Sequence, residues 1–141
     1  IMRIYLSSQE PPDIGYQWIP NIASLNQQVL DGEATSIVVD KFLCGFPVNE
    51  LEALLNKIIS KLRLNADLVI METDIDFLCT KYRRSAIDVE ELNSILFQNH
   101  SIKSLLTVDH IEKYLPPQIK ITHKNFDAKL SQITIKCRRS E

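Results

Sequence analysis

Three aspartates at or near the ends of short apolar runs could take protons from a substrate. Asp40 lies inside the β-branched run 36–42, and Asp74 and Asp76 follow the apolar run 67–72. A carboxylate beside a bound substrate can act as a general base. Asp74 and Asp76 have a second interpretation, because aspartates also cap turns and helices. Asp40 either pairs with Arg3 or Lys41 or points into a cleft.

A histidine and a basic cluster complete the set of reactive candidates. His100 follows a helical segment, and an imidazole titrates near neutral pH, although a loop histidine is more often structural. We therefore take Asp40, Asp74 and His100 as the catalytic candidates. Tyr82, Arg83 and Arg84 follow Asp76 and form, together with it, a candidate substrate site. The same cluster is also typical of the exposed face of a helix.

Length, composition and charge limit the kinds of protein to which this chain can belong. With 141 residues, of which 45% are hydrophobic, the chain is long enough for one domain, 1–141, with a single core. A net charge of −2 gives no overall reason to bind nucleic acid. Three widely spaced cysteines lack zinc-site spacing and favour a reducing compartment. Neither a membrane helix nor a signal segment is evident, so we expect a cytoplasmic protein that binds no metal.

The apolar pattern predicts the elements that position these candidates. Apolar residues at helical spacing from Leu51 to Leu62 predict an amphipathic helix, with Asn49 as its cap. Runs 36–42 and 67–72 flank it and predict a right-handed parallel βαβ unit. Asp88 and Thr107 are expected to begin two later helices. Further strands are expected at 2–6, 17–22 and in a C-terminal antiparallel hairpin. Ligands of such sheets bind at the carboxyl ends of the strands.

Local motifs add a resemblance that covers nearly the whole chain. After the first strand come Leu6-Ser7-Ser8-Gln9, Pro11-Pro12, Gly15-Tyr16 and the short run 19–22, and downstream come Glu91-Leu92-Asn93-Ser94-Ile95-Leu96-Phe97 and His100. In this order they resemble the small class I S-adenosylmethionine-dependent methyltransferases, above all those among glycan-modifying and phage proteins. The resemblance implies an α/β fold with a three-layer Rossmann-like, mainly parallel sheet and a C-terminal antiparallel hairpin. It also suggests a phage-encoded origin.

Departures from the family pattern fall at the cofactor site. By resemblance the cofactor-binding positions are Leu6, Ser7, Ser8, Gln9 and Asn21. Ser7 and Gln9 stand where the family has glycines, which let the backbone approach the cofactor. Asn21 stands where the family has an acid that binds ribose. The interval 21–37 is shorter than the family's, which abridges the region of its second and third strands. S-adenosylmethionine binding is therefore expected to be weak or lost.

Three functions stay open at this stage. The first is a degenerate methyltransferase-like domain, weak or inactive in catalysis, that acts as a binding or assembly subunit. The second is an active S-adenosylmethionine-dependent methyltransferase acting on a small molecule or a glycan. The third is a structural protein that forms a homodimer, or binds a partner protein, through the sheet edge around residues 17–35, since an uncovered edge invites pairing.

Overall fold

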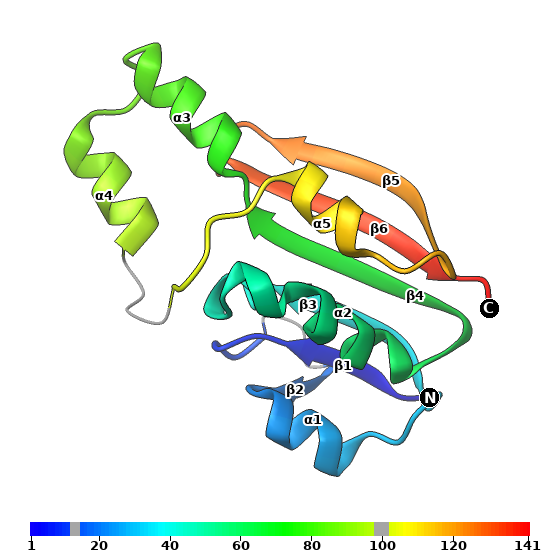
Figure 1. Ribbon diagram of the computed structural model, residues 1–141. Helices are drawn as coiled ribbons and strands as arrows, with labels where there is room; N and C mark the ends of the chain where they lie inside the picture. Colours follow the sequence, from blue (N-terminus) through cyan, green and yellow to red (C-terminus); the bar gives the residue numbers. More distant parts are fainter. Residues whose placement is uncertain (12–14, 98–101) are drawn as a thin grey trace.

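The protein is built on one six-stranded mixed sheet. The computed structural model describes residues 1–11, 15–97 and 102–141 (Figure 1). The strand order is β2-β1-β3-β4-β6-β5. The first four strands in this order are parallel, and β6 and β5 add an antiparallel hairpin. The α/β class, the mainly parallel sheet and the hairpin are confirmed. The bounds are β1 (Arg3–Leu6), β2 (Gln17–Ile19), β3 (Ala34–Asp40), β4 (Leu62–Thr73), β5 (Ile119–Asp127) and β6 (Gln132–Arg139).

Three helices lie against one face of this sheet (Figure 1). They are α1 (Ile22–Gln28), α2 (Leu51–Ser60) and α5 (Val108–Tyr114), and a single core cluster contains residues from all three. Each of these helices lies in a crossover between two parallel strands, and all three crossovers move across the sheet in the same direction: β2 to β3, β3 to β4 and β4 to β5. Because such crossovers are right-handed, their helices lie on the same face of the sheet. The connection from β1 back to β2 has no helix in its described part. Among the described residues, the helices packed on the sheet thus form one layer, where the expected arrangement had two.

The core joins the apolar face of α2 to the sheet. Leu51, Leu54, Leu55, Ile58 and Ile59 are all buried and pack toward alternate residues of β3 and β4. The predicted helix and the parallel βαβ unit are confirmed. The expected cap was wrong, because Asn49 belongs to a 3₁₀ turn, Val48–Glu50, and Glu50 at the helix start makes no side-chain cap bond.

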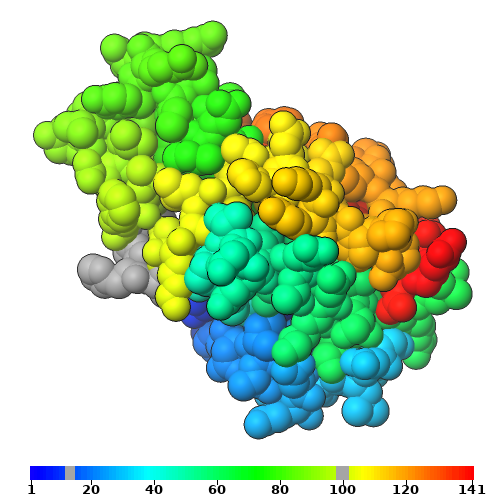
Figure 2. All heavy atoms as spheres, viewed as in Figure 1, coloured from blue at the N-terminus to red at the C-terminus, as the bar shows by residue number. Residues whose placement is uncertain are grey.

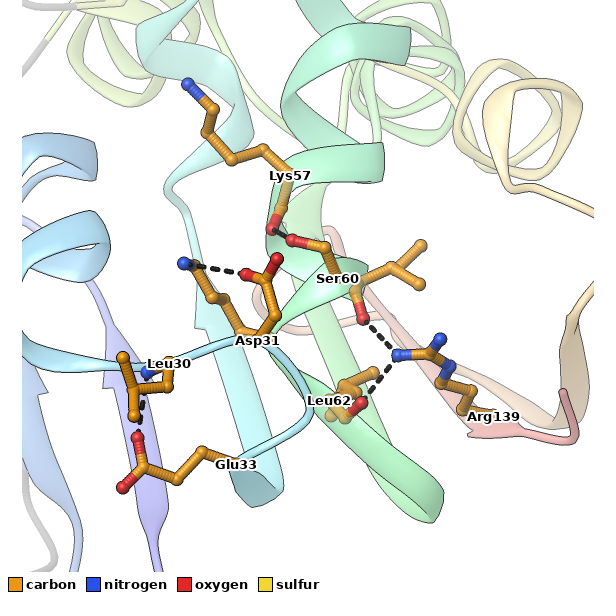
Figure 3. Close-up of polar contacts among 9 residues, drawn as sticks. Leu30, Asp31, Glu33, Lys57, Ser60, Leu62 and Arg139 are labelled. Atoms are coloured by element: carbon orange, nitrogen blue, oxygen red, sulfur yellow. Dashed lines mark hydrogen bonds and ion pairs between the residues drawn. The ribbon is translucent and has the colours of Figure 1, made fainter.

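Polar contacts fix the turn from α2 into β4, at the amino end of the strand (Figure 3). Arg139 of β6 donates from Nη1 to the carbonyl oxygens of Ile59, at 3.1 Å, and Leu62, at 2.6 Å. Lys61 donates to Asp31 at 2.9 Å. A cation at the last carbonyls of a helix also complements the helix dipole. These bonds tie α2, β4 and β6 together at the end of the sheet opposite the strands' carboxyl ends.

Two further helices extend beyond the carboxyl edge of the sheet. They are α3 (Ile75–Arg83) and α4 (Val89–Phe97), and their atoms project from the body of the molecule in Figure 2. Asp74 begins α3, because its Oδ1 accepts hydrogen bonds from the backbone of Asp76 and Phe77. The expected caps of α4 and α5 are confirmed, since Asp88 accepts from Glu91 N and Thr107 from His110 N.

The edge strand β2 is shorter than the apolar run predicted. It ends at Ile19, before Pro20, which cannot donate a backbone hydrogen bond. Ile22 already belongs to α1, whose N-cap is Asn21. In the described part of the chain, no helix is both long and apolar enough to cross a membrane.

Candidate functional site

A cavity of about 1020 Å³ opens at the carboxyl ends of β1, β3 and β4. Open α/β sheets bind their ligands at this edge. The strands end in line because β1, β3 and β4 are parallel neighbours, which brings distant parts of the sequence together. The lining residues are Tyr5, Ser7, Ser8, Gln9, Glu10, Asp40, Lys41, Cys44, Glu72, Thr73, Ile75, Ile95, Leu96, Ile102, Ser104, Leu105 and Leu106.

Glu72 is a buried acid in the wall of this cavity. Leu68, Ile70 and Glu72 alternate along β4 and so share one face, and the Glu72 side chain is only 2% exposed. Its Oε1 accepts a hydrogen bond from Cys44 N at 3.2 Å. Burial raises the pKa of Glu72 to about 7, and the charge of Asp40 adds to the rise. Hydrogen bonds from the backbone of Cys44 and Thr73 oppose it. Glu72 therefore exchanges a proton near neutral pH.

Asp40 and Tyr5 form a hydrogen-bonded pair in the same cavity. Tyr5 faces Val38 across the β1 and β3 pairing, so Asp40 follows on the same face. The Tyr5 hydroxyl donates to Asp40 Oδ2 at 2.5 Å. Burial, followed by the hydrogen bond and charge of Asp40, raises the pKa of Tyr5, so its phenol stays protonated. Asp40 thus points into the cavity, one of the two placements expected, and none of the ion pairs in the described part of the chain includes it.

The loop after β1 is held by its own hydrogen bonds. The Ser7 hydroxyl accepts from Gln9 N at 3.2 Å, and the Ser7 carbonyl accepts from the Trp18 indole at 2.9 Å. Ser7 N donates to Ile19 O at 3.4 Å. Ser7, Ser8 and Gln9 line the cavity, but the two Ser7 oxygens already have partners.

Cys44 joins three segments around the cavity. It lies in a 3₁₀ turn, Leu43–Gly45, after β3, and its carbonyl accepts from Lys103 N at 2.7 Å and Ser104 N at 3.2 Å. Its thiol donates to Lys41 O at 3.3 Å. Burial, followed by the charge of Glu72, raises the pKa of Cys44 to about 12. Cys44 is therefore a neutral thiol that positions Glu72 and the segment around Ser104, and it is no nucleophile near neutral pH.

Most of the remaining lining residues are apolar, apart from Glu10, Lys41 and Thr73. The apolar residues come from the start of α3, the end of α4 and the segment leading to α5. Leu106 makes an isolated parallel bridge with Asp74, and Ile75 N donates to Leu106 O at 3.1 Å. This bridge places the segment beside the end of β4. The apolar residues are Ile75, Ile95, Leu96, Ile102, Leu105 and Leu106.

The cofactor positions inferred by resemblance are brought together only in part. Ser7, Ser8 and Gln9 line the cavity, but Leu6 is fully buried in the core. Asn21 is not among the lining residues, and its Oδ1 accepts from Ser24 N at 2.8 Å as the cap of α1.

The remaining candidates that belong to the described residues do not line this cavity. Asp74 caps α3 and, with Asp76, lines a separate hollow of about 410 Å³. Tyr82 is 45% exposed near the end of α3, and Arg83 beside it is exposed as well. Arg84 is the C-cap of α3 and is also exposed. His100 lies outside the described residues.

Sequence reasoning did not identify Tyr5, Glu72 and Ser104 as site residues. A signal was present for Glu72, because it continues the buried alternation of Leu68 and Ile70 with a charged side chain. Tyr5 and Ser104 carried no such signal, since their neighbours come from segments distant in the sequence.

No protein-family model and no curated protein matches the chain. Among solved structures it is similar to magnesium protoporphyrin IX methyltransferase from Synechocystis, with bound SAH, at a TM-score of 0.57 and 15% identity, over 89% of this chain and 51% of that one. It is also similar to an N-methyltransferase from Bradyrhizobium japonicum in complex with S-adenosyl-L-homocysteine. The TM-score is 0.57 and the identity 12%, and the match covers 99% of this chain and 67% of that one. A third similar structure is a SAM-dependent methyltransferase from Thermotoga maritima, described as a possible histamine N-methyltransferase. The TM-score is 0.56 and the identity 14%, and the match covers 89% of this chain and 65% of that one. The chain thus spans about half of the first of these proteins, and it has the Rossmann-like fold that they share.

Proposed function

We propose that this chain, which has the fold of class I S-adenosylmethionine-dependent methyltransferases, is a binding domain that takes S-adenosylmethionine weakly or not at all. It would then act as a binding or assembly subunit with little or no catalysis. The observation that carries the proposal is the position of Asn21, whose side chain caps α1 and does not line the cavity.

The cavity has room for the cofactor, but the residues fit it poorly. Its volume of about 1020 Å³ is at the upper end of ordinary ligand pockets. A ribose needs an acceptor at the end of β2, and the Asn21 oxygen is already bonded to Ser24 N. A hydrogen bond to a charged acceptor contributes about 1.5 to 3 kcal/mol, so its loss weakens binding roughly 10-fold to 150-fold.

Calorimetry with S-adenosylmethionine and S-adenosylhomocysteine tests this proposal. We expect a dissociation constant of about 100 µM or weaker for the unmodified chain. The double variant Ser7→Gly, Asn21→Asp should tighten binding by no more than roughly tenfold, because the aspartate uses one oxygen to cap α1 and its position does not line the cavity. An aspartate still caps α1, so this variant should keep the fold. Asn26→Asp is the matched control, because Asn26 is an exposed residue of the same helix. Low-micromolar binding by the unmodified chain would overturn the proposal.

A second candidate is an active methyltransferase on a small molecule or a glycan. The large cavity, whose lining acids include Asp40 and Glu72, favours it, because methyl transfer depends mainly on positioning and on removal of a proton. Transfer of a labelled methyl group from S-adenosylmethionine to panels of small amines, alcohols and glycans measures it. Turnover that Glu72→Gln abolishes would favour this candidate over the first, and the absence of turnover with every panel would reject it.

A third candidate is self-association through the edge around residues 17–35. The three-residue strand β2 forms that edge, with Trp18 40% exposed and Leu30 72% exposed. An uncovered edge favours pairing with a second copy. Light scattering should then give the mass of a dimer, and Leu30→Glu should return the mass of a monomer. A monomer at high concentration would contradict this candidate.

A further inference from the structure

The cavity carries an excess of negative charge. Glu10, Asp40 and Glu72 line it, against a single lining cation, Lys41. No ion pair among the described residues includes either Asp40 or Glu72. A buried carboxylate without a cation is costly, and Glu72 is only 2% exposed. A positively charged ligand group would offset that cost.

Ser104 independently indicates that a polar ligand atom belongs here. It lines the cavity and is only 8% exposed, yet its Oγ has no hydrogen-bond partner among the described residues. Buried hydroxyl groups in folded proteins nearly always have a partner. Ser104 N donates to the Cys44 carbonyl, and Cys44 N donates to Glu72, so Cys44 links Ser104 to the buried acid.

Apolar side chains of the cavity lining are left partly exposed. Helix α4 has no fully buried residue, and its Ile95 and Leu96 are half-buried residues that line the cavity. Leu105 lines it too and is 46% exposed. These side chains gain stabilisation when an apolar group covers them.

We infer that the ligand of this cavity is an apolar amine, with its ammonium group at Glu72 and Asp40 and its apolar body against α4 and Leu105. The inference rests on the proposed function, since it names the ligand class of the same cavity. Anionic ligands such as nucleotides and carboxylates are disfavoured, because they would add charge of the same sign.

Calorimetry with three indole probes tests the inference. The probes are tryptamine, its neutral alcohol tryptophol and its anionic counterpart indole-3-acetate, at about pH 8, where Glu72 is mostly ionised because burial places its pKa at about 7. We expect tryptamine to bind at least roughly tenfold more tightly than tryptophol, and indole-3-acetate to bind least. Equal binding of all three probes, or no binding of tryptamine at millimolar concentration, would overturn the inference.

Two variants test the charged part and the apolar part of the site separately. Glu72→Gln keeps an oxygen for Cys44 N but removes the charge, so the preference for tryptamine over tryptophol should fall to about twofold or less. Glu52→Gln, an exposed acid of α2, is the matched control and should keep the full preference. Leu96→Asn should weaken tryptamine and tryptophol equally. A full preference in Glu72→Gln, in a variant that shows cooperative unfolding, would overturn the assignment of the ammonium group.

The calorimetry with S-adenosylmethionine distinguishes this inference from the proposed function. Tight cofactor binding with the predicted order of the three indole probes would reject the proposed function and keep the amine site. Weak cofactor binding without preference among the probes would do the reverse.

Discussion

The pH dependence of stability should change when Glu72 is replaced by glutamine. Burial raises the pKa of Glu72 from its ordinary value of 4.5 to about 7, so the folded chain favours the protonated acid. The stability that this proton contributes is complete below about pH 4.5 and is lost as the pH rises through about 7. Between those two values the folded state binds more protons than the unfolded state.

The size of the effect follows from the two pKa values. Their difference corresponds to a loss of about 3 kcal/mol in the free energy of unfolding between pH 4.5 and pH 8. Glutamine has no proton to lose and can still accept the bond from Cys44 N. Glu72→Gln should therefore match the unmodified chain near pH 4.5 and exceed it by up to about 3 kcal/mol at pH 8. Cys44 does not interfere, because burial raises its pKa to about 12.

Urea denaturation followed by circular dichroism, at intervals from pH 4.5 to pH 8, measures this difference. Glu52→Gln serves as the control and should follow the unmodified chain, because Glu52 is exposed. Parallel pH curves for Glu72→Gln and the unmodified chain would contradict the expected loss of a proton from Glu72. A glutamine variant that is the less stable of the two at pH 8 would contradict it as well.

Three further substitutions test the packing around the site and the core. Arg139→Lys should lower the free energy of unfolding by about 1 to 2 kcal/mol in urea denaturation, because lysine lacks the guanidinium fork that bonds the carbonyls of Ile59, Leu62 and Glu141 from two nitrogens at once; unchanged stability would contradict this. Ser104→Ala should leave thermal stability unchanged or raise it by up to about 1 kcal/mol, because its hydroxyl has no partner in the described part of the chain; a clear loss would speak against an unpaired hydroxyl. Leu55→Ala should cost about 2 to 5 kcal/mol in urea denaturation, because Leu55 is fully buried; a loss under about 1 kcal/mol would mean that the site is loosely packed.

Local periodicity accounts for the parts of the fold that the sequence predicts well. The apolar face of α2 and the runs in β3 and β4 are set by neighbouring residues, so the parallel βαβ unit follows from short-range patterns. The single helical layer does not follow from short-range patterns, because it depends on the order of the strands and on the path between β1 and β2. The cap at Asn49 failed for a similar reason, since a 3₁₀ turn precedes α2.

The site was predictable only where it sits directly at a strand end. Asp40 and Ser7 could be placed at the carboxyl edge, because Asp40 lies in one recognisable strand and Ser7 directly follows another. The bond from Tyr5 to Asp40 joins residues 35 positions apart, and the bond from Cys44 to Glu72 joins residues 28 apart. Contacts of this kind depend on strand register, which a single sequence does not specify.

Nuclear magnetic resonance with S-adenosylhomocysteine tests whether the cavity at the carboxyl edge is a ligand site with little affinity for this cofactor. Backbone amide shifts are followed as the ligand is added to the labelled chain. We expect small shifts around Ser7, Asp40 and Glu72 that do not saturate below about 100 µM, the affinity expected after loss of the ribose acceptor. Saturation at low micromolar concentration, or shifts confined to surfaces away from these residues, would contradict this expectation.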